Sequence, residues 1–398
     1  MPRAVFLLII LIAPALAEAR VVVFWQAGFP TRESQPLSEE ALSSALRGSQ
    51  PVFLGLDDLE KPNALVDAEL LVLPYGSAFP ADVWKAVHDY LQGGGNLLTL
   101  GGRPLYIPVR RQGKMFVEDR PQNTFSSSLG IRHSYPAPQA DWKGFAWDAN
   151  FSFLGELEIR AKRVFVAGVW WDSGDYRGMG HFLNALGDRV AAPVTREDFR
   201  DLRGGNRPSL LGARCVMLNF EPQPGYWDSS DGIALIRSAA DYARQGATVF
   251  RVEMGNATIA SGEKVQAIVH LRNLRKQRRG ESLNGTVRVE LMAGNQTIES
   301  TQAQCRGETV QESVSFRRDL SPGLYTVRAS YEEDGKTQET YRTGFWSRDE
   351  KLLKSGARLE AGSTYFRKDG VPFVPFGTNY FTTDEYSIGF LGSSNAYV

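Results

Sequence analysis

The chain has 398 residues, of which 42% are hydrophobic and 11% aromatic, so it can bury more than one core and is not a disordered protein. Its 45 Lys and Arg residues balance 45 Asp and Glu residues, which excludes a general electrostatic attraction to nucleic acid or to an anionic membrane. The length predicts two or three domains.

Residues 1–19, MPRAVFLLIILIAPALAEA, have the layout of a secretory signal peptide. Arg3 precedes a short apolar run and small residues follow it, so cleavage after Ala17 or Ala19 is expected. An uncleaved membrane anchor is the alternative, but an anchor needs roughly 20 apolar residues. This run is shorter and contains Pro14. The sequence predicts export to the periplasm or the extracellular space, with no membrane span in the mature chain.

Residues 20–248 are predicted to form an α/β domain. Apolar runs at 20–25, 69–76 and 96–100 are typical of strands buried on both faces, and a run with helical spacing begins at Pro80. Strands and helices in alternation predict a parallel sheet with right-handed crossovers.

The α/β pattern is interrupted by residues 103–210. This part is rich in Gly, Pro and aromatic residues, and only scattered short strands such as 163–170 are predicted in it. The pattern resumes with a strand at 213–222 and a final helix at 230–245, whose acidic start and basic end suit the helix dipole.

Residues 249–347 change to a period of two, which predicts strands with one buried face. Short strands at this spacing over about a hundred residues are typical of an immunoglobulin-like β-sandwich. Cys215 and Cys305 fall in different predicted domains, so two buried free thiols are expected rather than a disulfide. The expected strands are 264–272, 285–291, 309–316, 324–331 and 337–345.

The basic run RNLRKQRRGE at 272–281 lies between two of these strands and lacks interleaved aromatic residues. We therefore expect a solvated loop rather than a nucleic-acid site. His88, His133, His181 and His270 are scattered, without a metal-binding spacing, so neither a metal nor another cofactor is predicted.

A glycine-rich turn, LLTLGGRP at 97–104, follows a predicted strand at the place where α/β folds put nucleophiles and phosphate-binding loops. The turn continues into Arg103 and Pro104 and contains no nucleophile, so a tight structural turn is favoured.

The α/β region, about 20–247, resembles the class I glutamine amidotransferase-like superfamily. The resemblance rests on ELLVLPYGSAFPADVWKAVHDYLQGGGNLLTLGG and on LNFEPQPGYWDSSDG. It implies a parallel, flavodoxin-like sheet. Assembly of subunits through this domain is a further possibility that the sequence leaves open. Active members have a cysteine in the turn where this chain has Gly101 and Gly102, so the resemblance implies a degenerate copy without amidotransferase chemistry.

Two aromatic clusters lie beside carboxylates and leave two interpretations open. Flat rings next to carboxylates suit stacking on sugars, and they equally suit packing of the insertion onto the sheet. The aromatic residues are Trp170, Trp171, Tyr176, Tyr226 and Trp227, and the acids are Asp172, Asp175, Glu221 and Asp228.

Residues 348–398 include YFRKDGVPFVPFGTNYF, in which Asp369 and Gly370 predict a hairpin turn and 373–379 an apolar strand. This stretch resembles the start of the catalytic (β/α)8 barrel of secreted glycoside hydrolases of the cellulase and β-galactosidase clan. The resemblance places Asn379 and Tyr380 on the rim of the substrate cleft, where active sites of such barrels lie. The plain alternative is that these two residues finish a strand.

The resemblance implies catalytic glutamates on later barrel strands, which this chain does not contain; Asp384 and Glu385 follow the first strand too closely. We therefore expect the front part of an exported hydrolase of O-glycosidic bonds, with a carbohydrate substrate, from an incomplete reading frame and inactive as it stands. The alternative is a non-catalytic exported protein whose α/β and sandwich domains bind a partner or assemble subunits.

Overall fold

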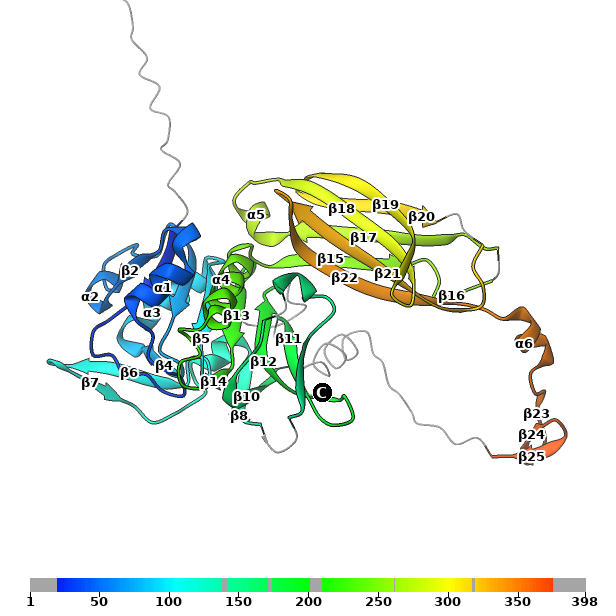
Figure 1. Cartoon of the computed structure of the whole chain (residues 1–398), viewed down its shortest axis with the longest axis horizontal. Helices are drawn as coiled ribbons and strands as arrows, with labels where there is room; N and C mark the ends of the chain where they lie inside the picture. The colour runs from blue at the N-terminus through cyan, green and yellow to red at the C-terminus, as the bar shows by residue number, and fades with distance from the viewer. Residues whose placement is uncertain are drawn as a thin grey trace, which may run out of the picture.

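The computed structural model describes residues 20–137, 142–155, 157–170, 174–200, 210–260, 262–316 and 319–374. Figure 1 shows an α/β part at one side, a β-sandwich packed next to its helix α4, and a small C-terminal sheet that stands apart from both. No helix within the described ranges is long and apolar enough to cross a membrane.

An eight-stranded sheet forms the centre of the α/β part, in the order β2-β1-β3-β5-β13-β12-β11-β9. The first five strands in this order pair in parallel, as the sequence predicts, and the last three continue the sheet with antiparallel pairing. The strands are β1 (Arg20–Phe24), β2 (Val52–Leu54), β3 (Ala68–Leu73), β5 (Asn96–Leu100), β9 (Gly144–Trp147), β11 (Asp175–Leu183), β12 (Arg189–Asp198) and β13 (Arg214–Leu218).

Helices cover both faces of this sheet. On one face α1 (Glu39–Ala45) and α4 (Ser230–Arg244) pack together, and on the other lie α2 (Leu56–Leu59) and α3 (Trp84–Gln92). The hydroxyl groups of Ser38 and Ser229 accept hydrogen bonds from the first turns of α1 and α4, so these N-termini are capped by the residue type that the position favours. Short 3-10 helices lie at Arg47–Ser49, Ala81–Val83, Ser126–Leu129 and Ser152–Leu154.

The insertion contains longer strands than the scattered ones that the sequence predicts. Two of them, β11 and β12, have nine and ten residues and extend the central sheet. The two strands pair with each other across a short connection, from Leu183 with Arg189 to Asp175 with Asp198. Other strands of the insertion form two small sheets with strands outside it. They are β4 (Ala78–Pro80) with β6 (Ile107–Gln112) and β7 (Met115–Glu118), and β14 (Phe220–Pro222) with β10 (Ala161–Val169) and β8 (Ile131–Pro136).

The sandwich consists of a three-stranded sheet, β15-β17-β20, facing a five-stranded sheet, β16-β22-β21-β18-β19. Alternate residues of both sheets fill one core, which includes Val269, Val289 and Val327. The strands are β15 (Thr248–Met254), β16 (Thr258–Ile259), β17 (Val265–Asn273), β18 (Leu283–Ala293), β19 (Gln296–Gly307), β20 (Thr309–Phe316), β21 (Gly323–Glu333) and β22 (Lys336–Ser347), with α5 (Leu274–Arg278) after β17.

After the sandwich the chain forms α6 (Glu350–Ser355) and three strands of three residues each, β23 (Leu359–Ala361), β24 (Phe366–Lys368) and β25 (Val371–Phe373). The predicted hairpin turn joins β24 to β25, and both of its residues have positive φ, 52° at Asp369 and 79° at Gly370. Every residue of these four elements is exposed except Glu350, which is half-buried.

Candidate functional site

The carboxyl edge of the parallel strands is where α/β sheets usually bind ligands. The loops after β1, β3 and β5 bring Glu33, Ser77 and Arg103 together there. The Arg103 guanidinium donates to Glu33 Oε2 at 2.8 Å and to Oε1 at 2.5 Å, and it lies 3.7 Å from the centre of the Tyr106 ring. The Ser77 hydroxyl donates to Glu33 and accepts from the Arg103 backbone N–H at 2.7 Å. The ion pair of Glu33 and Arg103 therefore occupies the carboxyl edge of the parallel strands.

The glycine-rich turn beside this ion pair has no room for a side chain. Gly101 has φ +89° and Gly102 has φ +66°, a region that favours glycine. A Cβ at Gly101 would lie 2.4 Å from the Ser34 hydroxyl, and one at Gly102 would lie 2.5 Å from the Ser77 hydroxyl. Ser34 is held in place, because its hydroxyl accepts from the Trp227 indole at 3.2 Å. The two serines fill the space that a nucleophile in this turn would need.

The aromatic residues that suggested a sugar contact are mostly in the core. Tyr176, Tyr226 and Trp227 are at most 4% exposed, so packing is the interpretation that holds for these three. The hydroxyl of Tyr176 donates to Thr195 Oγ1 at 3.1 Å and that of Tyr226 to a backbone carbonyl at 2.9 Å. Trp170 is 36% exposed, with the Arg132 guanidinium 4.9 Å from its ring. Trp171 and Asp172 lie outside the described residues.

Glu221, the acid beside the second aromatic cluster, is engaged by two cations. Its carboxylate accepts from Lys162 Nζ at 3.0 Å and from Arg163 Nε at 2.5 Å. Burial by itself would raise the pKa of Glu221, but these two hydrogen bonds outweigh it and lower the pKa. Glu221 is therefore an ionised structural residue and does not suit the role of a general acid, which must hold a proton near neutral pH.

A buried ion network, which no local sequence pattern predicts, joins the α/β part to the sandwich. It consists of Arg196, Asp198, Arg214, Tyr242 and Glu339, which we call the inter-domain network. Asp198 and Arg214 are fully buried and are joined by two hydrogen bonds, of 2.7 and 2.9 Å. Glu339 enters from β22 of the sandwich and accepts from Arg214 and from the Tyr242 hydroxyl.

The charges in and beside this network hold one another ionised. Burial would raise the pKa of Asp198, but Arg196 and Arg214 lower it. The neighbouring Asp175 behaves alike: burial opposes ionisation, and Arg177, Arg200 and Arg196 together keep its pKa far below the usual range. Each carboxylate is matched by guanidinium groups, so the arrangement is a structural clamp and offers no free acid or base.

The basic run is a second clamp, which corrects the expectation of a solvated loop. It forms α5, and Arg275 donates to the backbone carbonyl of Arg244 at 2.5 Å and to Glu69 at 3.2 Å. Glu69 also pairs with Arg244 at 2.8 Å. Burial would raise the pKa of Glu69, but Arg275 and Arg244 outweigh it and lower the pKa. Arg275 of this run therefore contributes to the contact between the two domains.

The histidines and cysteines form no reactive centre in the described part of the chain, where no group of three His, Cys, Asp or Glu side chains could hold a metal ion. His181, the histidine of most interest from the sequence, is 2% exposed. His270 lies 3.0 Å from Glu253 on the sandwich surface. Cys215 and Cys305 are free thiols, and burial raises the pKa of each.

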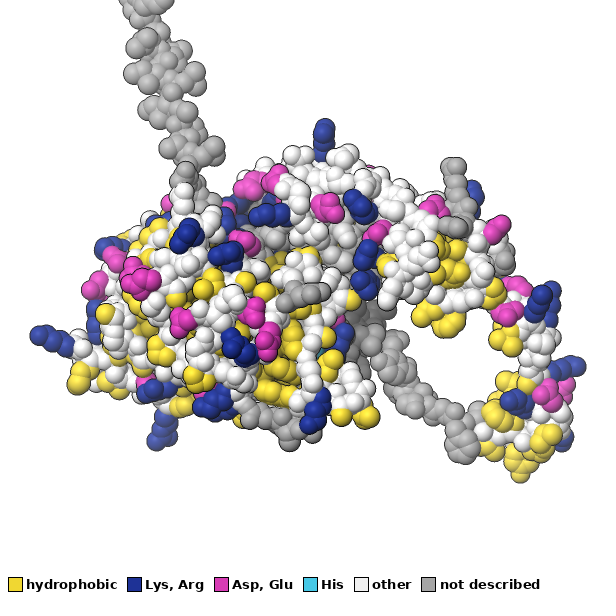
Figure 2. All heavy atoms as spheres, viewed as in Figure 1, with side chains coloured by type: hydrophobic (Ala, Val, Ile, Leu, Met, Phe, Trp, Pro, Cys, Tyr) yellow, Lys and Arg dark blue, Asp and Glu magenta, His cyan; other side chains and the backbone are white. Residues whose placement is uncertain are grey.

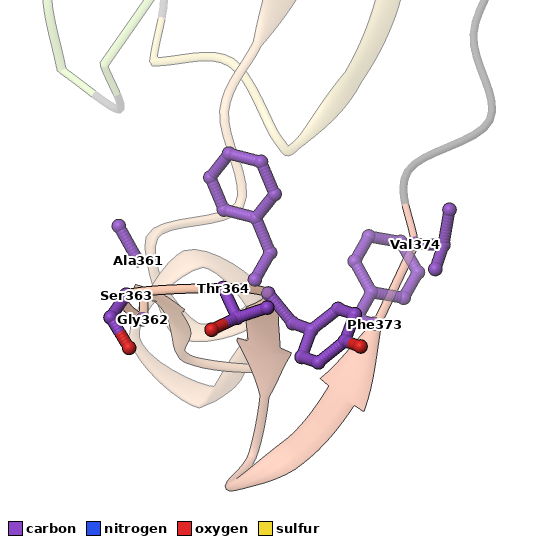
Figure 3. Close-up of a pocket in the computed structure, with 8 residues that line it drawn as sticks. Ala361, Gly362, Ser363, Thr364, Phe373 and Val374 are labelled. Carbon is purple, nitrogen blue, oxygen red and sulfur yellow. The ribbon is translucent and has the colours of Figure 1, made fainter.

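A shallow hollow of about 260 Å³ lies on the small C-terminal sheet. Figure 3 shows it, with Phe373 and Val374 on one side and residues 361–364 on the other. The described residues that line it supply hydroxyl groups and aromatic rings but no carboxylate, so they cannot carry out acid–base hydrolysis. The two predicted substrate-binding residues, Asn379 and Tyr380, lie outside the described residues, as do Asp384 and Glu385.

No family model matches the chain, and no curated protein matches it. Among solved structures, a β-galactosidase from Rahnella sp. R3 is 11% identical over 75% of this chain and 41% of its own, with a TM-score of 0.36. A β-galactosidase from Bacillus circulans sp. alkalophilus is 11% identical over 74% of this chain and 41% of its own, with a TM-score of 0.33.

The CARDB domain of a Pyrococcus furiosus protein, in complex with di-metal ions, is 13% identical over 25% of this chain and 87% of its own, with a TM-score of 0.21. The chain spans about two fifths of the length of the two β-galactosidases. The likeness is low in each case, so we infer the function of the chain from its own residues.

Proposed function

We propose that this chain is the non-catalytic front part of an exported glycoside hydrolase that acts on O-glycosidic bonds. The observation that carries the proposal is the C-terminal segment. Its sequence resembles the start of a glycoside hydrolase barrel, and its three short strands expose Leu359, Phe366, Val371 and Phe373, which are between 36% and 65% exposed.

Such a sheet requires a larger fold around it. Small sheets are stable only when an apolar face packs on other elements, and here each strand has three residues without a buried side chain. A contiguous exposed apolar surface marks an interaction site in a soluble protein. A barrel that begins with these strands would supply the missing cover.

The rest of the chain suits a scaffold role. The ion pair of Glu33 and Arg103 closes the sheet edge, and Gly101 and Gly102 leave no place for a nucleophile. On this proposal the α/β part is a degenerate amidotransferase-like domain that can assemble subunits, and the sandwich is immunoglobulin-like. The catalytic glutamates come from later barrel strands, and Asn379 and Tyr380 contact the carbohydrate. No cofactor is required.

Two experiments test the proposal together. The first is the gene sequence beyond the Val398 codon, where we expect the reading frame to continue for about 200 residues or more, the remainder of a barrel. The second is an assay of the purified 398-residue chain on a panel of aryl glycosides and polysaccharides, in which we expect no hydrolysis. A stop codon directly after Val398 contradicts the hydrolase assignment, and hydrolysis by the chain contradicts its non-catalytic role.

A further inference from the structure

Large apolar side chains that are exposed gather at one end of the described chain. Only five of them lie before residue 324 within the described ranges: Val66, Met115, Tyr135, Trp170 and Leu186. Figure 2 shows the others as apolar surface at the far end of the sandwich and around the C-terminal sheet. They are Leu324, Trp346, Leu352, Leu353, Leu359, Tyr365, Phe366, Val371, Phe373 and Val374.

Four of these residues form what we call the exit patch: Leu324, Trp346, Leu352 and Leu353. Leu324 of β21 and Trp346 of β22 are paired in register and are 58% and 56% exposed. Their neighbours Tyr325 and Phe345 point into the core, so this pair stands on the outer face of the sheet.

The apolar character is confined to this end of the outer face. Farther along β21, the same outer face carries Thr326 and then Arg328. Arg328 pairs with Glu290 at 2.6 Å. The register places Arg342 beside Arg328. A surface that served only as solvated sheet would carry such polar residues throughout, so the Leu324 and Trp346 pair calls for a separate explanation.

The two leucines of α6 follow this pair closely along the chain. The Arg348 backbone N–H donates to the Ile259 carbonyl at 2.9 Å, so the chain stays paired with β16 to that residue. The next residue, Asp349, caps α6 by accepting from the backbone N–H groups of Lys351 and Leu352 at 2.9 and 3.0 Å. Leu352 and Leu353, 66% and 61% exposed, lie in the capped helix.

We propose that the exit patch is the surface on which the domain begun by β23–β25 packs, so that one polypeptide supplies both sides of the contact. The inference rests on the proposed function, because that domain is the barrel. Residues 354–358 separate the patch from β23 and span roughly 20 Å at most. A domain joined by so short a segment is present at an effective concentration in the millimolar range, so a small apolar patch suffices to hold it.

The chemistry of the patch favours this occupant over a sugar. A sugar site combines a flat ring with side chains that bond hydroxyl groups, whereas the exit patch has one indole and three leucines. Along the chain, the patch is followed directly by the apolar surface of β23–β25. A domain of the same polypeptide therefore explains both apolar surfaces, and a second copy of the chain is not needed. Both alternatives are outcomes of the test.

Hydroxyl-radical footprinting read by mass spectrometry tests the proposal residue by residue. The oxidation rates of Leu324, Trp346, Leu352 and Leu353 are compared between this chain and the complete polypeptide of the natural gene. We expect at least a fivefold lower rate at all four residues in the complete polypeptide. Met115, 70% exposed on β7 of the other domain, is the internal control and keeps its rate.

Variants of the complete polypeptide separate docking from folding. Trp346→Lys is expected to return Leu352 and Leu353 to the rates of the shorter chain, while Val66→Lys, at a site 68% exposed, leaves them protected. If Trp346→Lys does not fold, Leu324→Ser supplies the same readout.

Unprotected patch residues in a complete polypeptide that hydrolyses glycosides overturn the docking inference alone. Absence of any longer, hydrolytic polypeptide overturns the proposed function and the inference with it. Two results overturn the choice of occupant: protection in the 398-residue chain that rises with protein concentration, as for a second copy, and protection that rises with added cello- or galacto-oligosaccharide.

Discussion

Glu339 of the sandwich accepts a hydrogen bond from Arg214 Nη2 of the central sheet at 2.5 Å, although the two residues are 125 positions apart. The Arg214 guanidinium also lies 4.0 Å from the Tyr242 ring, and Tyr242 donates to the same carboxylate at 3.2 Å. A strand and a helix of the α/β part thus bind a single carboxylate of the sandwich. These hydrogen bonds join the two domains at a buried contact.

Glu339→Gln is expected to lower the free energy of unfolding by about 3–5 kcal/mol, because it leaves the buried Arg214 short of a counter-charge. Urea denaturation measures the change. Glu118→Gln is the matched control: Glu118 is 29% exposed and pairs with Arg32 on the surface, so it should cost no more than about 1 kcal/mol. Equal effects of the two substitutions would show that the inter-domain network does not stabilise the fold.

Arg275→Ala tests the role of the basic run. We expect a loss of about 1.5–3 kcal/mol in the free energy of unfolding, since the substitution removes charge-assisted hydrogen bonds to Glu69 and to the Arg244 carbonyl. Arg251→Ala, at a side chain 52% exposed that pairs with Glu253 of its own strand, should change it by at most about 1 kcal/mol. If the basic run were a solvated loop, Arg275→Ala and Arg251→Ala would change the free energy of unfolding by similar amounts.

Gly101→Ala is expected to destabilise the chain by roughly 2–4 kcal/mol, because it combines an unfavourable positive φ with a collision against Ser34. In a Ser34→Gly background the collision is gone and only the backbone strain is left, so the same substitution should cost less. Thermal unfolding of the four proteins measures the coupling. Additive effects would mean that Ser34 does not fill the space above the turn.

Acid should unfold the protein by protonating the clamped carboxylates. The pKa values of Asp175, Asp198 and Glu69 are lowered in the folded chain by the neighbouring arginines. Their contribution is therefore fully present above the ordinary carboxyl pKa of about 4 and is lost as pH falls below it, by up to about 1.4 kcal/mol per pH unit for each group. Urea midpoints between pH 7 and pH 2.5 should fall mainly below pH 4, and less steeply in Asp175→Asn.

The sequence predicts well the elements that bury continuous apolar runs. The runs at 20–25 and 96–100 are β1 and β5, and the helix predicted at 230–245 is α4. Local spacing carries this information because both faces of such strands are apolar. The alternation of buried and exposed residues predicts the sandwich strands, because only one face of each strand is buried.

Such local patterns do not predict the contacts between the two domains. β12 ends in Arg196, Glu197 and Asp198, which read as a polar loop although all three are buried. Their partners, Arg214 and Glu339, are distant in the sequence. The basic run at 272–281 likewise resembles a solvated surface unless the acceptors of Arg275, Glu69 and the Arg244 carbonyl, are known.

One measurement tests most directly that this chain is the front part of an exported glycoside hydrolase. An antiserum raised against the purified chain is used to precipitate the protein from the exported fraction of its natural source. The proposal predicts a polypeptide longer than this chain by about 200 residues or more, with glycosidase activity in the precipitate. A polypeptide no longer than this chain, without activity on any glycoside, would contradict it.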